Sequence, residues 1–129
     1  MTTDLKMLAW IAGITALMWL PYILARMAKS GVMATLTYAA DNDPLPDWAA
    51  RAKKAHYNEI ENLAPFAAVV LVAQAAGAAN ATTALWATVY FWARVAHYLG
   101  YVSGIPFART LFFAVGWLAT LIIFWQIVG

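Results

Sequence analysis

The sequence predicts an all-α integral membrane protein, a four-helix bundle formed by a single domain of residues 1–129. Of these 129 residues 64% are hydrophobic and only 11% are charged, whereas a soluble domain is about half apolar and about a quarter charged. A globule of this size cannot bury so much apolar surface. Four segments are also long and apolar enough to cross about 30 Å of hydrocarbon as helices.

The first span is expected at about residues 5–24, with Pro21 kinking its end. Its apolar stretch begins at Met7 and runs for about 18 residues, with no small-x-small cleavage site after it. It is therefore interpreted as an uncleaved span and not as a signal peptide.

The second helix is expected at about residues 47–79, after the turn-forming cluster DNDPLP, with Asp47 as a plausible N-cap. A helix of that length would be roughly 50 Å long, so its charged first half should extend out of the bilayer. The third and fourth spans are expected at about 83–101 and 106–128. Their short links, GAANATT and VSGIP, predict antiparallel neighbours.

Basic residues set the expected orientation. The long link between the first two spans carries five of them, and the other side offers only Lys6; the five are Arg26, Lys29, Arg51, Lys53 and Lys54. The positive-inside rule places this link in the cytoplasm and both termini outside. A net charge of +2 gives no reason to expect a nucleic-acid partner, and the absence of cysteine excludes disulfides and thiolate metal sites. No metal is expected.

Polar side chains form one stripe on each of two helices. At 100° per residue, one face of the second helix and one face of the third carry them; they are Arg51, Lys54, Asn58, Glu61 and Asn62, and Arg94, His97, Tyr98 and Tyr101. His56 lies off the stripe and is interpreted as a surface or interface residue. A charge at membrane depth costs roughly 2.5–3.5 kcal/mol, so such residues usually face the bundle interior and pair. Glu61 with Arg94 is the expected ion pair.

The stripes have two interpretations. They could line a site, because Arg26 and Arg109 lie at the same expected depth, or they could clamp the helices together by hydrogen bonds alone. A third class, a small four-span exporter, is disfavoured because residues 7–25 carry no carboxylate before Arg26.

Two motifs resemble signatures of the MAPEG superfamily, the membrane-associated proteins in eicosanoid and glutathione metabolism. KAHYNEIENLAPF matches the pattern Arg/Lys-Ala-His, Asn, Glu-Asn and Pro-Phe, and its wording is closest to the microsomal glutathione transferase branch. ARVAHYLGYVSGIPFARTLFF is similar to the family's third-span Arg-x-x-His-x-x-x-Tyr and to the arginine that opens the fourth span; here these are Arg94, His97, Tyr101 and Arg109.

The resemblance implies a homotrimer that binds glutathione, as co-substrate, between subunits near the cytoplasmic side. The implied glutathione contacts are Arg26, Asn58, Glu61, His97, Tyr101 and Arg109. Arg109 corresponds to the family's candidate for stabilising the thiolate, with Thr110 or Tyr101 adding a hydrogen bond. One departure is Tyr57, where the prostaglandin synthase branch has an arginine that helps to hold glutathione; another is a Tyr101–Arg109 link one residue shorter. The bacterial character of the sequence implies a multi-pass protein of the inner membrane.

The chemistry agrees with this implication, because the thiolate is the nucleophile. Lowering a thiol pKa by about two takes roughly 2.7 kcal/mol. One guanidinium about 4 Å away supplies roughly 4 kcal/mol at an effective dielectric constant of about 20. The leading hypothesis is a membrane glutathione transferase or peroxidase acting on lipophilic electrophiles or hydroperoxides that arrive through the membrane lipid. The alternative is a non-enzymatic membrane scaffold or small-ligand-binding protein whose polar layer is structural.

Overall fold

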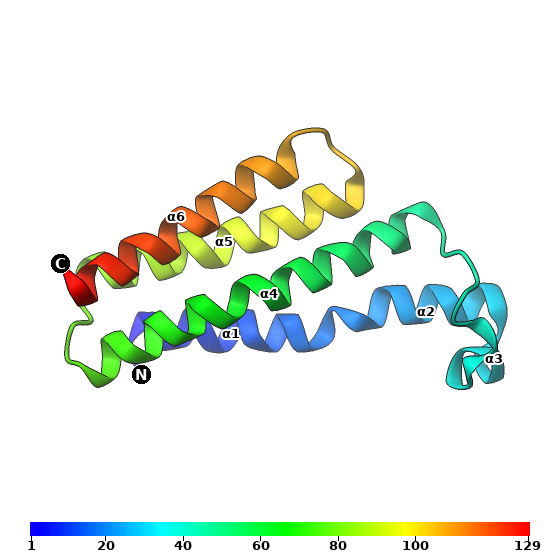
Figure 1. The fold of residues 1–129 in the computed structure, drawn as a ribbon, viewed down its shortest axis with the longest axis horizontal. Coiled ribbons are helices and arrows are strands. Elements are labelled where there is room, and N and C mark those ends of the chain that lie inside the picture. Colours follow the sequence, from blue (N-terminus) through cyan, green and yellow to red (C-terminus); the bar gives the residue numbers. More distant parts are fainter.

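A computed structural model describes all of residues 1–129, and it is helical with no strand. Two long rods lie side by side, one built from α1 and α2 and the other from α4, and the α5–α6 hairpin packs along them (Figure 1). The elements in chain order are α1 (Thr3–Leu17), α2 (Trp19–Ser30), α3 (Val32–Leu36), the 3₁₀ turn η1 (Tyr38–Ala40), α4 (Asp47–Ala75), α5 (Ala81–Ser103) and α6 (Ala108–Val128). The predicted all-α bundle is confirmed.

The first helix breaks earlier than the sequence suggested. α1 ends at Leu17, and α2 starts at Trp19 after a tight turn in which the Met18 amide donates to Thr15 at 3.2 Å. Pro21 has no amide hydrogen to give the Leu17 carbonyl, so the ladder is interrupted one turn before the proline. Helical structure then continues to Ser30, beyond the expected end at residue 24.

α4 also differs at both ends from the expected range of 47–79. Pro46 occupies the N-cap position, and Asp47 is the first helical residue without a capping hydrogen bond, so the N-cap prediction was wrong. The helix ends at Ala75, where Gly77 adopts a φ of 68° and the amides of Ala78 and Ala79 both turn back to the Ala73 carbonyl. A glycine in the left-handed region is a common helix stop.

The two termini and the α4–α5 turn lie at one end of the bundle, and the long α2–α4 link and the α5–α6 turn lie at the other (Figure 1). Side-chain bonds tie the terminal end together. Gln74 donates to the Thr2 hydroxyl at 2.9 Å, and Asn80 donates to the Gln126 side chain at 2.9 Å. The N-terminus of α1 is thus held to the end of α4, and the start of α5 to the end of α6.

The core lies in the terminal half of the bundle. Phe66 of α4 stacks on Tyr90 of α5 with ring centroids 3.6 Å apart, and Ile11 of α1 and Ile123 of α6 are fully buried around them. Two helical rods, Thr3–Ser30 and Ala108–Val128, are long and apolar enough to cross a membrane. Their outer faces carry exposed large side chains such as Trp117, as expected for surfaces in lipid.

Candidate functional site

Five of the predicted site residues line one pocket at the end of the bundle away from the termini. The pocket holds about 240 Å³ and lies between α4, α5 and the start of α6; its lining residues are Asn58, His97, Tyr101, Arg109, Thr110 and Phe113. Helix periodicity accounts for the arrangement, because residues 97 and 101 are four apart on α5 and residues 109, 110 and 113 share one turn of α6. The structure therefore brings these side chains together.

Arg109 sits above Tyr101. Its guanidinium carbon lies 5.1 Å from the centroid of the Tyr101 ring, which is within cation–π range. His97 packs edge-on against the same ring, with centroids 5.7 Å apart, and its side chain is buried. Tyr101 thus positions a buried imidazole on one side and an exposed guanidinium on the other.

A second cavity continues from this pocket toward the α5–α6 turn. It holds about 420 Å³ and shares Tyr101, Arg109 and Thr110 with the first. Arg51 of α4 lines it and donates from Nε to the Val102 carbonyl at 3.0 Å, so it also fastens α4 to the end of α5. Two guanidiniums in adjoining cavities make this end of the bundle favourable for an anion.

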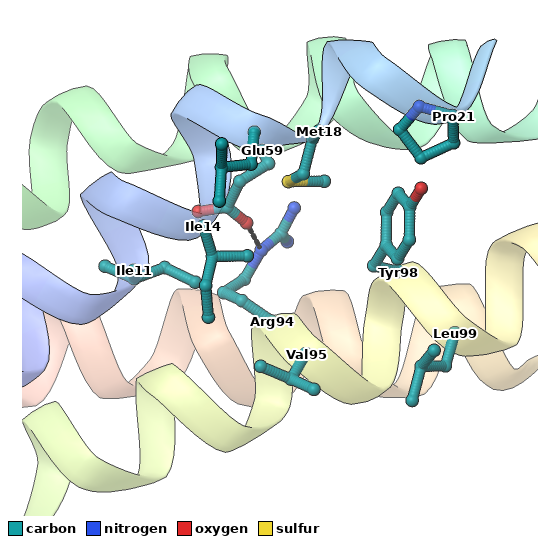
Figure 2. Close-up of a pocket in the computed structure, with 10 residues that line it drawn as sticks. Ile11, Ile14, Met18, Pro21, Glu59, Arg94, Val95, Tyr98 and Leu99 are labelled. Carbon is teal, nitrogen blue, oxygen red and sulfur yellow. Dashed lines mark hydrogen bonds and ion pairs between the residues drawn. The ribbon is translucent and has the colours of Figure 1, made fainter. Parts of the chain in front are cut away.

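The buried ion pair is not the predicted one. Arg94 donates from Nε to the carboxylate of Glu59, and both side chains are almost fully buried (Figure 2). Tyr90 donates to the same carboxylate at 3.3 Å, and Arg94 Nη2 donates to Asn58 Oδ1 at 2.7 Å. The Glu61 side chain is exposed and makes no hydrogen bond within the chain, whereas Arg94 pairs with Glu59, so the Glu61–Arg94 prediction was wrong.

The rotation of α4 explains this correction. Most buried residues of α4 recur every three, four or seven positions, which is the spacing of one helix face; the buried residues are Ala49, Ala52, Ala55, His56, Glu59, Phe66, Val70 and Ala73. Glu59 belongs to this series, whereas Glu61 is two residues further and points about 160° away from it. The spacing of the alanines was the signal in the sequence that could have identified Glu59.

Of the two interpretations of His56, a surface or an interface residue, the structure supports the second. The His56 side chain is buried, and its Nδ1 shares a 2.8 Å hydrogen bond with the Tyr22 hydroxyl of α2. This bond holds the second rod to the first, beyond the break at Met18.

Two predicted contacts lie outside the pocket within this chain. Arg26 donates from Nη1 to the carbonyls of Ala40 and Asp43, at 2.5 and 2.9 Å, and so organises the α2–α4 link. Glu61 projects from the exposed side of α4. Phe113, which does line the pocket, was not predicted, because an aromatic residue in an apolar helix resembles any lipid-facing one.

Comparison with known families confirms the family resemblance that the two motifs indicated. The model of the MAPEG family matches residues 7–129, essentially the whole chain. No curated protein and no solved structure shows a significant match. With a family match over this length and an all-helical bundle with apolar helices, the chain belongs to the MAPEG family.

Proposed function

We propose that this protein is a glutathione-dependent membrane transferase or peroxidase that acts on lipophilic electrophiles or hydroperoxides. Family membership favours glutathione-linked chemistry in general. The observation that carries the proposal is the pocket in which Asn58, His97, Tyr101, Arg109 and Thr110 meet. It combines hydrogen-bonding groups for a polar peptide with a cation for its sulfur.

In the proposed reaction the glutathione thiol releases its proton to water, and the Arg109 guanidinium stabilises the resulting thiolate. With an electrophile, sulfur forms a bond to carbon while the leaving group departs with the bonding electrons. With a hydroperoxide, sulfur attacks the terminal oxygen and an alcohol leaves; a second glutathione then reduces the sulfenic acid and forms the disulfide with loss of water. Thr110 and Tyr101 would donate hydrogen bonds to the thiolate.

The exposure of Arg109 supports a homotrimer as the active assembly. Arg109 and Thr110 are exposed in the single chain. A guanidinium 4 Å from a thiolate contributes only about 1 kcal/mol in bulk water but about 4 kcal/mol at an effective dielectric constant of 20. A neighbouring subunit that covers the pocket would exclude water. It could also supply Arg26 and Glu61, which lie outside the pocket of their own chain.

Calorimetric titration of glutathione into the purified protein tests binding. We expect saturable heat and a higher melting temperature, because a ligand that binds only the folded state stabilises it. The alternative, a membrane scaffold whose polar layer is structural, predicts neither. A protein that is stable and trimeric but gives no heat and no thermal shift would support the scaffold.

Arg109→Ala tests the chemical role. We expect this variant to lose the thiolate absorbance of bound glutathione at about 240 nm, with the trimer intact by native mass spectrometry. Arg109→Lys is the matched control, because it keeps a positive charge and should retain part of the signal. An unchanged thiolate signal in Arg109→Ala would rule out the role assigned to Arg109.

A further inference from the structure

A third cavity is lined by Arg94 and shares no lining residue with the proposed thiol site. It holds about 250 Å³ between the α1–α2 rod and α5, at the level of the helix break at Met18 (Figure 2). Its walls are apolar, with Ile14 and Met18 on one side and Val95 on the other. Leu17 and Leu99 form its rim and are 61% and 59% exposed, on surfaces that would face lipid.

This apolar pocket contains an unused hydrogen-bond donor. Arg94 is only 2% exposed; its Nε and Nη2 are bonded to Glu59 and Asn58, but its buried Nη1 has no partner. Buried polar groups are nearly always hydrogen-bonded. Arg94 lines the pocket, and its guanidinium faces the space between Met18 and Tyr98 (Figure 2). Nη1 itself is closed off in this conformation, so a small shift of the side chain would bring it within reach of an acceptor in the pocket.

The surrounding groups favour a neutral acceptor. The Glu59 carboxylate already neutralises Arg94, and it lines the same pocket, so a second carboxylate would meet a like charge. The Tyr98 hydroxyl also lines the pocket, has no hydrogen bond within the chain and offers a second donor. A hydroxyl or ester oxygen could accept from both without bringing in a charge.

We propose that this pocket binds a single-chain lipid from the bilayer, with a neutral oxygen head on Arg94 Nη1 and its chain leaving between Leu17 and Leu99. The pocket is slightly smaller than most drug-sized sites, so it accommodates the head and the first part of the chain. The inference is independent of the proposed function, because none of the residues that line this pocket lines the thiol site.

The test uses full-length protein in lipid nanodiscs with a photoreactive hexadecanol whose diazirine lies near the hydroxyl. We expect cross-links on peptides that contain Leu17 or Leu99. Unlabelled hexadecanol should compete at least about tenfold better than hexadecanoate or hexadecane, which corresponds to one hydrogen bond or one charge repulsion. Labelling spread evenly over the lipid-facing surface would overturn the site, and equal competition by hexadecanoate would overturn the neutral head.

Two variants test the pocket itself. Val95→Trp fills it and should reduce cross-linking at least about tenfold, whereas Leu85→Trp is the matched control, because Leu85 is exposed on α5 and does not line the pocket. Tyr98→Phe keeps the ring but removes one donor, and it should weaken competition by hexadecanol without changing that by hexadecane. If Val95→Trp does not fold, Tyr98→Phe decides, and undiminished competition by hexadecanol in that variant contradicts the proposal.

Discussion

The Arg94 side chain connects three helices. From α5 it donates to Glu59 and Asn58 of α4, and its Cδ packs against Gly116 of α6. The same side chain lines the apolar pocket together with Glu59, and it bonds Asn58, which lines the proposed thiol site. A single residue therefore holds the bundle together at the depth where both cavities lie.

Glu59→Gln should destabilise the protein strongly, because it leaves Arg94 buried beside a neutral amide. Removing one partner of a buried ion pair costs about 3–5 kcal/mol, and Gln should cost somewhat less because its oxygen still accepts. Glu61→Gln is the matched control two residues away, and as an exposed substitution it should change stability by less than about 0.5 kcal/mol. Thermal unfolding in nanodiscs measures the stability of both variants. A larger loss of stability for Glu61→Gln would favour the Glu61–Arg94 ion pair predicted from the sequence.

At the scale of elements, the approach of α6 to α5 depends on Gly116. A Cβ atom at this position would lie 3.2 Å from Arg94 Cδ and 3.7 Å from the Tyr90 ring. The first distance is closer than ordinary van der Waals contact, so any side chain here must displace Arg94 or α6. Small residues permit this kind of close helix packing in membranes.

Gly116→Ala should therefore lower the melting temperature, although alanine is the better helix former by about 1 kcal/mol. Gly13→Ala is the matched control, because a Cβ there meets nothing within 4 Å, and it should leave stability unchanged or raise it. Both variants gain the same helix propensity, so the difference between their melting temperatures reports the contact with Arg94 alone. Equal shifts for both variants would show that the contact with Arg94 has no energetic effect.

At the scale of the whole molecule, the distribution of charge and the arrangement of the ends agree. The long α2–α4 link and the α5–α6 turn lie at one end of the bundle, together with most of the basic residues, and the termini lie at the other (Figure 1). By the positive-inside rule, we expect the first end to lie in the cytoplasm. The predicted orientation therefore has the long α2–α4 link in the cytoplasm and both termini outside.

The absence of cysteine makes that orientation easy to test. Asp41→Cys places a thiol in the exposed α2–α4 link, and Gly129→Cys places one at the exposed C-terminus. In intact cells a membrane-impermeant maleimide should label Gly129→Cys and not Asp41→Cys, and permeabilised cells should show both. The opposite pattern would invert the topology.

The sequence by itself determined that the chain is an all-helical membrane bundle, and it identified five side chains that meet in one pocket. Apolar length, helix periodicity and the two MAPEG motifs carry this information locally, within single helices and short links. The prediction for the first span was wrong only about where the helix is interrupted. Pro21 does interrupt it, but the break falls at Leu17, because the Leu17 carbonyl is the group that lacks the missing Pro21 amide hydrogen.

Only the tertiary structure decided how each helix is turned about its axis. Periodicity places residues relative to one another on a helix, but the absolute rotation depends on which face packs against the neighbouring helices. That rotation buries Glu59 in place of Glu61, and it divides the α5 stripe so that Tyr98 lines one cavity and Tyr101 another. The sequence could not have predicted the unpartnered Arg94 Nη1 either, because its surroundings are formed by helices that are distant in the chain.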